Sequence, residues 1–186
     1  MACESISRGR KWQCMKTFNG LKAVSFLNFT QLTLGADDKF AGLGLAGQEL
    51  FRFELNQPEN LYEEETVADE STMTAVTTGT LTLVLPFLDT ETRNEAKKLI
   101  NGRPQIFLEH KSGEIYLIGF ENGATLTNFK MSTGGAASDM AGFNMSFKTI
   151  ERMPYITLNS AGITAYQDAI NITDVITPGA GLPLGS

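Results

Sequence analysis

Few side chains in this sequence combine the type and the spacing that catalysis or metal binding requires. His110 is the only histidine and falls at the end of a predicted strand beside a turn, where a hydrogen-bonded or exposed role is simpler than that of a general base. No serine or cysteine has the local signature of an activated nucleophile. Cys3 and Cys14 have no neighbouring histidine or second cysteine pair, so they indicate neither a metal site nor a disulfide framework. We therefore expect no catalytic residue, no metal and no cofactor.

The glycine-rich segment Ser132–Gly142 could cradle a phosphate through its backbone N–H groups. However, the Gly-Lys-Ser/Thr ending of a phosphate-binding loop is missing, and no helix is predicted after it. A flexible connection between two strands is the simpler interpretation.

The strongest charged feature is an acidic cluster in the polar segment Gln57–Met73, which consists of Glu63, Glu64, Glu65, Asp69 and Glu70. Carboxylate oxygens suit calcium, but the alternating Asp spacing of a dedicated calcium loop is absent. A solvated loop of mutually repelling charges is the simplest interpretation. The alternative is a contact with the basic N-terminal segment of a neighbouring copy, where Arg8, Arg10 and Lys11 surround Trp12, the only tryptophan.

Length and charge limit the classes of function that are possible. The 186 residues suit one domain with arms, and the 15 basic and 21 acidic residues give a net charge of −6. This balance argues against a surface that grips nucleic acid by neutralising phosphates. No apolar run approaches the roughly 20 residues of a membrane helix, and the N-terminus has no signal-peptide pattern. We therefore expect a protein that is made in the cytoplasm and does not insert into membranes.

The middle of the chain predicts a strand followed by one short helix. Thr80–Leu85 alternates, with its leucines on one face, and Pro86 ends the strand because it has no N–H to donate. The segment 89–101 has acidic residues in its first turn, basic residues near its last, and Gly102 and Pro104 just beyond, which are typical helix boundaries. Its narrow apolar stripe places the helix on the flank of a sheet. The stripe consists of Ala96, Leu99 and Ile100.

Several further segments have the alternation and the turns of strands. After the helix, four strands separated by turn residues predict an antiparallel meander; they are Gln105–His110, Ile115–Phe120, Ala124–Met131 and Gly142–Arg152. Before it, strands are predicted at Ala23–Phe29 and Glu49–Leu55, with a loop at Gly35–Gly47 between them. Residues 57–79 are expected to form an extended hairpin that projects from the body.

The two ends of the chain are expected to be arms. Residues 1–19 form the basic N-terminal arm, and residues 20–158 form the domain. Residues 160–186 form a C-terminal arm with scattered large apolar residues and an end rich in Pro and Gly, which favours docking on another subunit over an internal core. These apolar residues are Ile163, Tyr166, Ile170, Ile172, Val175 and Ile176.

This combination of features is similar to a bacteriophage tail tube protein. The shared features are a β-rich core with one short helix between strands, an acidic hairpin, a basic N-terminal arm and an apolar C-terminal tail. The segment Gly102–Ala124, with the sequence GRPQIFLEHKSGEIYLIGFENGA, and the segment Ser132–Glu151, which contains DMAGFNMSF, also resemble structural proteins of tailed phages. The resemblance covers roughly residues 20–158.

The resemblance implies a mainly β fold of two packed antiparallel sheets that shares its sheet edges with other copies in a hexameric ring. Stacked rings would form a hollow tube, located in the virion, through which DNA passes without specific binding. Related tubes line type VI secretion systems and contractile bacteriocins. On this chain, Tyr62–Gly79 would be the stacking hairpin, the arms would contact neighbouring subunits, and other phage tail proteins would be further partners.

Two other classes of function remain open from the sequence. One is a β-sandwich binding module of a virion, such as a head decoration or baseplate protein, which exposed aromatic residues on one sheet face would support. The residues to inspect are Tyr116, Phe120 and Tyr155. An enzyme, based on His110 and scattered carboxylates, has the least support.

Overall fold

Residues 19–170, apart from residues 36, 72, 87, 89, 137 and 138, are described by a computed structural model. The first strands are β1 Leu21–Leu27, β2 Thr33–Leu34, β3 Phe40–Leu43, β4 Phe51–Glu54, β5 Leu61–Asp69 and β6 Thr74–Pro86. Helix α1 Thr90–Asn101 follows, and then β7 Gln105–His110, β8 Ile115–Ile118, β9 Thr125–Ser132, β10 Gly142–Glu151, β11 Ile156–Thr157 and helix α2 Ser160–Ala169.

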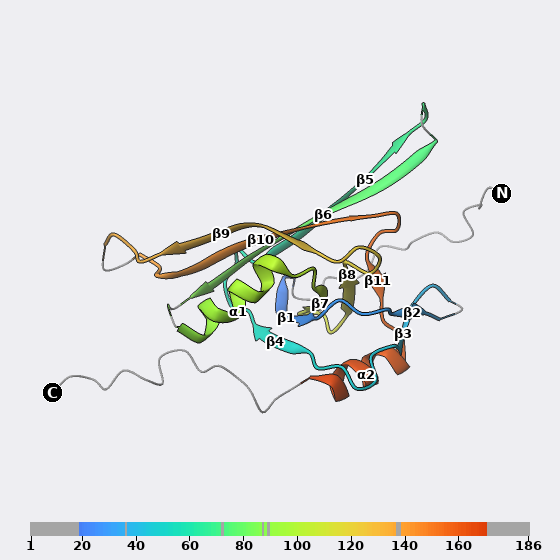
Figure 1. Ribbon diagram of the computed structural model, residues 1–186, viewed down its shortest axis with the longest axis horizontal. Helices are drawn as coiled ribbons and strands as arrows, with labels where there is room; N and C mark the ends of the chain where they lie inside the picture. The colour runs from blue at the N-terminus through green and yellow to red at the C-terminus, as the bar shows by residue number, and fades with distance from the viewer. Residues whose placement is uncertain are drawn as a thin grey trace.

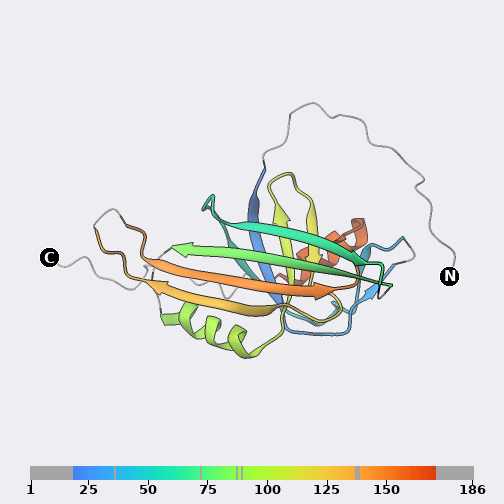
Figure 2. The same cartoon turned by 90° about the horizontal axis from the view of Figure 1, so that it is seen from above.

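Two antiparallel sheets form the body, which confirms the predicted mainly β fold. The five-stranded sheet has the order β11-β8-β7-β1-β4, and the four-stranded sheet has the order β5-β6-β10-β9. In Figure 2 the long strands of the four-stranded sheet cross steeply over β1, β7 and β8. Figure 1 shows the same sheet as an outer layer along one side of the molecule.

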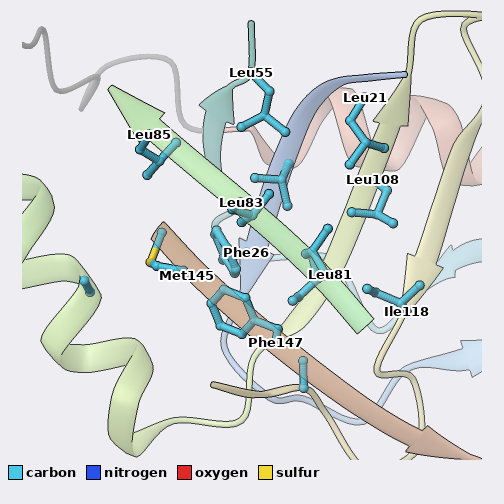
Figure 3. Close-up of a cluster of buried hydrophobic side chains, with 14 of the residues drawn as sticks. Leu21, Phe26, Leu55, Leu81, Leu83, Leu85, Leu108, Ile118, Met145 and Phe147 are labelled. Carbon is cyan, nitrogen blue, oxygen red and sulfur yellow. The ribbon is translucent and has the colours of Figure 1, made fainter. Parts of the chain in front are cut away.

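The main core lies between these two sheets, and Figure 3 shows its side chains. The predicted alternation of β6 is confirmed, because Leu81, Leu83 and Leu85 are all buried there. In β10, Phe147 packs against Phe26 of β1 with ring centroids 5.3 Å apart. Burial of such side chains contributes about 1.5–3 kcal/mol each. The core therefore holds the two sheets firmly against each other.

Helix α1 confirms the predicted helix and its place beside a sheet. Its buried side chains are Thr92 and Ala96, and Ala96 joins the core between the sheets. The helix runs alongside β9, on the side of the four-stranded sheet that faces the core (Figures 1 and 2). Asp89, the first residue of the predicted helix, lies outside the described residues.

A second apolar core covers the other face of the five-stranded sheet. The segment 35–47, predicted as a loop, contains β3, which pairs with β2. Phe40 of β3 is fully buried against Phe107 of β7, with ring centroids 5.8 Å apart. The prediction of a loop was therefore wrong. The glycines of this segment lie in bends around a short hairpin, and Phe40 anchors that hairpin to the sheet.

The start of the predicted C-terminal arm is also part of this core. Tyr166 of α2 is only 2% exposed, its ring lies 5.4 Å from that of Phe107, and its hydroxyl lies 2.9 Å from Ser25 Oγ. Asn159 caps the helix, since its side chain accepts a hydrogen bond from Gly162 N. The expectation that this segment docks on another subunit was therefore wrong for residues 160–170. Ile163, Tyr166 and Ile170 have helical spacing and pack on the chain's own sheet.

The predicted continuous meander was wrong at one point. Strands β7 and β8 form a hairpin in the five-stranded sheet, whereas β9 and β10 form a hairpin in the four-stranded sheet. The turn between β8 and β9 is held in place by Glu151 at the end of β10, whose carboxylate accepts the N–H of Glu121 at 2.7 Å. Strand β11 occupies the free side of β8, so β9 joins the other sheet.

Candidate interaction surfaces

The acidic segment forms a long hairpin, as predicted. Strand β5 pairs with β6 in unbroken register from Leu61 opposite Thr82 to Asp69 opposite Thr74. Strand β10 accompanies β6 only as far as Thr77, which pairs with Glu151. Beyond this row the hairpin has no third strand and projects from the body (Figure 1).

The projecting tip carries large apolar side chains in solvent. Val67 and Val76 are directly opposite each other and are 58% and 42% exposed. Met73, at the turn, is 91% exposed. Isolated exposed apolar residues are common, but a group at the end of a projecting hairpin indicates a contact surface.

Tyr62 and Glu64 belong to the base of the hairpin, on the face that points into the molecule. Burial raises the pKa of Tyr62, and the nearby Glu64 carboxylate raises it further. Gly79 on β6 leaves the room for this ring, because a Cβ at that position would collide with the Tyr62 hydroxyl and with Thr149. Glu64 accepts the backbone N–H of Tyr155 at 3.0 Å, so it ties the hairpin to the segment that leads to β11.

Two partly buried carboxylates therefore lie on the inward face near the base of the hairpin. Burial raises the pKa of both Glu64 and Glu151 above the usual range, although each accepts backbone hydrogen bonds that lower it. The charges of Glu121 and Glu64 raise the pKa of Glu151 further. These groups orient local segments of the chain.

The predicted acidic cluster is consequently divided by the pleat of β5. Glu63 and Glu65 are exposed on the outward face, and Glu70 is exposed at the tip. Asp69 accepts hydrogen bonds from the N–H of Ser71 at 2.8 Å, which stabilises the turn. Only Glu63, Glu65 and Glu70 remain available to a neighbouring copy, whereas Glu64 is engaged within the chain.

The outward face of the four-stranded sheet is largely polar, and no described element packs on it (Figure 1). Its exposed apolar side chains are Leu61 and Ile150, each 51% exposed. Along β6 this face presents a row of threonines, Thr78, Thr80 and Thr82. Lys148 of β10 and Lys130 of β9 add two exposed cations to the face. None of these residues was predicted to belong to a site. The period-two repeat of threonine in 78–82 was the signal that could have identified the face.

Both edges of this sheet are free in the described part of the chain, since β5 and β9 are its terminal strands. Strand β5 spans nine residues and β9 spans eight. An unpaired strand of this length leaves a row of N–H and C=O groups ready to pair with another chain. The two edges are therefore candidate sites of self-association.

A further charged network was missed because its members are far apart in sequence. Glu109 of β7 accepts hydrogen bonds from Lys22 at 2.5 Å and from Arg52 Nη2 at 3.0 Å. Strand pairing across β1 brings these three residues together. Burial acts to raise the pKa of Glu109, but the hydrogen bonds from Lys22 and Arg52 outweigh it and hold the pKa below its usual range.

The predicted arms are only partly described. Arg8, Arg10, Lys11 and Trp12 lie outside the described residues, as do Ile172, Val175 and Ile176. Ile170 is half-buried, and its backbone forms a bridge with Leu50. Ile170 therefore belongs to the domain, and the role of the other arm residues remains a prediction.

His110 and the three candidate aromatic residues do not form a common site. His110 Nε2 accepts the N–H of Gly20 at 3.2 Å, and Nδ1 lies 2.8 Å from Ser112 Oγ within the same turn. Tyr116 contacts Tyr155, with ring centroids 4.9 Å apart. Phe120 packs instead on the second core and borders a shallow depression with Phe29. The three aromatic residues therefore do not form one exposed cluster.

Neither a metal site nor a membrane span is found in the part of the chain that the structure describes. No group of three or more His, Cys, Asp or Glu side chains there could hold a metal ion. None of the described helices has the length and hydropathy needed to cross a bilayer.

The sequence matches no family model, and neither a curated protein nor a solved structure matches it.

Proposed function

We propose that this protein is a structural subunit that assembles side by side into rings, and that the rings stack into the tube of a phage tail. The observation that carries the proposal is the four-stranded sheet. It combines two long free edges, an uncovered polar face and a hairpin that projects beyond its end. Six copies per ring and the passage of DNA come from the resemblance to tail tube proteins.

The direction of the strands supports association through the sheet edges. Every neighbouring pair in the order β5-β6-β10-β9 is antiparallel, so β5 and β9 run in opposite directions. Strand β9 of one copy can therefore lie beside β5 of the next copy and continue the antiparallel pattern. A closed ring of such sheets forms a barrel and removes the exposed edges.

The uncovered face suits the lining of a channel for DNA. It carries hydroxyl groups together with charges of both signs, including Glu63 and Glu65 on β5 and Lys130 and Lys148 on the other half. A lining that lacks a dense row of Lys and Arg releases few counterions from DNA and binds it weakly. Weak binding lets DNA move through the tube.

The projecting hairpin suits contacts between stacked rings. Its apolar tip, formed by Val67, Met73 and Val76, extends past the last row of the sheet, so a neighbouring ring can bury it. Burial of exposed apolar surface is the main source of association free energy.

Electron microscopy of the purified full chain tests the proposal. We expect rings or tubes with a central hole, and sedimentation velocity should show species much larger than a monomer. A protein that stays monomeric at high concentration in both measurements would contradict the proposed function.

A binding module of a virion is the second candidate, and the contact between Tyr116 and Tyr155 favours it. Tyr155 is 48% exposed, and the Tyr116 hydroxyl donates a hydrogen bond to Glu114. Aromatic rings beside a carboxylate suit carbohydrate. If this alternative holds, titration with bacterial surface polysaccharide should change the tyrosine fluorescence of a monomeric protein, and Tyr155→Ala should abolish the change.

A further inference from the structure

We infer that opposite charges on the two free edges of the four-stranded sheet select the pairing of β5 of one copy with β9 of the next, with Lys130 against Glu63 and Glu65. The inference rests on the proposed function. It adds which residues choose the partner edge and why two identical edges do not pair.

The β5 edge is acidic along its outward face. Tyr62 points into the core, so the alternation of the strand places Glu63 and Glu65 on the opposite side, where both are exposed. No Lys or Arg occurs between residues 57 and 79, so the hairpin contains no cation that could neutralise them.

The β9 edge is basic. Phe129 packs toward the core, against Phe143 with ring centroids 5.7 Å apart, so Lys130 points outward. Lys130 is exposed and lies opposite Asn144, so the neighbouring strand offers it no carboxylate at that row. Strand β9 contains no Asp or Glu.

The edges could pair in three ways, and charge distinguishes them. Two β5 edges would bring the glutamates of both copies together, and two β9 edges would bring two lysines together. Like charges directly opposite on neighbouring strands destabilise a pair, whereas opposite charges stabilise it. Only the β5 to β9 pairing brings Lys130 beside Glu63 or Glu65.

This choice decides the type of assembly. Pairing of two identical edges is isologous and stops at a dimer, whereas pairing of different edges repeats and generates a closed ring or a filament. Each exposed charge contact contributes little affinity, so backbone pairing and apolar contacts hold the ring together. The charges mainly exclude the wrong pairing.

Charge reversal at one edge tests the inference. Lys130→Glu makes both edges acidic, and we expect it to weaken side-by-side association about tenfold, measured as the dissociation constant by sedimentation. The matched control is Lys148→Glu, which makes the same change on the same face but on the inner strand β10. It should assemble as the wild type does. Circular dichroism and thermal melting check that each variant is folded.

The charge-reversed variants, each alone and then mixed, distinguish the three pairings. Glu63→Lys with Glu65→Lys makes both edges basic, so this variant alone should also assemble poorly. Mixed with Lys130→Glu at equal amounts, it should restore assembly, because each β5 edge then meets a β9 edge of opposite charge. Pairing of two β5 edges would instead leave Lys130→Glu unaffected, and that result would overturn the inference.

Carbodiimide cross-linking of the wild-type protein provides a direct readout. Within one copy, β6 and β10 lie between β5 and β9, so the distance across the sheet from β5 to β9 is about 14 Å. A zero-length link from Lys130 to Glu63 or Glu65 must therefore join two copies. A mixture of chains labelled with nitrogen-14 and nitrogen-15 should give the mixed-mass cross-linked peptide. Rings that form without this link and resist Lys130→Glu would refute the edge assignment and leave the proposed function standing. A wild-type protein that never assembles would refute both.

Discussion

Shortening the hairpin should separate the stability of one subunit from the stacking of rings. We propose to replace residues 68–75 by Asn-Gly and to change Val67 and Val76 to threonine. The two valines are directly opposite each other, so a two-residue turn can join them, and threonine retains a preference for strands. Sheet rows that include β10 begin at Thr77 and are left intact.

The expected cost to the isolated subunit is small. Every described residue from 67 to 76 is exposed, so the deletion uncovers no core. We expect the free energy of unfolding to change by less than about 1 kcal/mol, which corresponds to a shift of at most about 4 °C in Tm. The cost to stacking should be larger, because burial of the exposed apolar surface of Val67, Met73 and Val76 contributes about 1–2 kcal/mol for each side chain.

Calorimetry and electron microscopy of the shortened protein measure the two effects separately. We expect an unchanged melting transition and rings that no longer stack into tubes. Glu70→Gln is the matched control, since it changes the same tip without removing apolar surface, and it should still form tubes. A fall in Tm of more than about 10 °C would show that the tip supports the fold. Tubes that persist after shortening would refute its role in stacking.

Three substitutions test the interactions inside the subunit, each by urea unfolding. Glu109→Gln should lower the free energy of unfolding by about 1–3 kcal/mol at pH 7, because it breaks the ion pair with Arg52. The folded-state pKa of Glu109 is lowered, so this deficit should shrink as the pH falls below about 4. A deficit independent of pH would contradict the argument. Glu151→Gln should show the opposite sign. Burial raises the pKa of Glu151, so the wild type loses stability as the pH rises above the usual value of 4.5, and the glutamine variant should lose less. A variant that instead weakens relative to the wild type over this range would count against the argument. Tyr166→Phe should lower the free energy of unfolding by about 1–2 kcal/mol, because it leaves the buried Ser25 hydroxyl unpaired. A double variant with Ser25→Ala should recover part of that stability. No loss of stability at all would place α2 outside the folded core.

Several elements could be predicted because their signals are local. The leucines of β6 and the phenylalanines of β10 alternate within each strand, and the structure buries both sets. The helix at Thr90–Asn101 was recognisable from charges and from Gly and Pro within a few residues of its ends. The hairpin of β5 and β6 was recognisable from its polar composition between two alternating segments. Each of these signals lies within the element that it describes.

Other features could not be predicted because distant segments compete for them. Tyr166 belongs to the core only because Phe107 and Ser25 provide a surface for its helix. The Asn-Gly turn after β8 leads into the other sheet, since β11, more than thirty residues later, occupies the place that a meander would use.

Composition and alternation alone were enough to predict a β-rich protein with an acidic hairpin and one flanking helix. The division of the acidic cluster required the folded structure. The pleat of β5 turns Glu64 inward to Tyr155 and leaves Glu63 and Glu65 on the outward face. The identity of the free edges also required it, because an edge is free only when no other strand of the chain pairs with it. Backbone hydrogen bonds look alike in every strand, so sheet order depends on the packing of the whole chain.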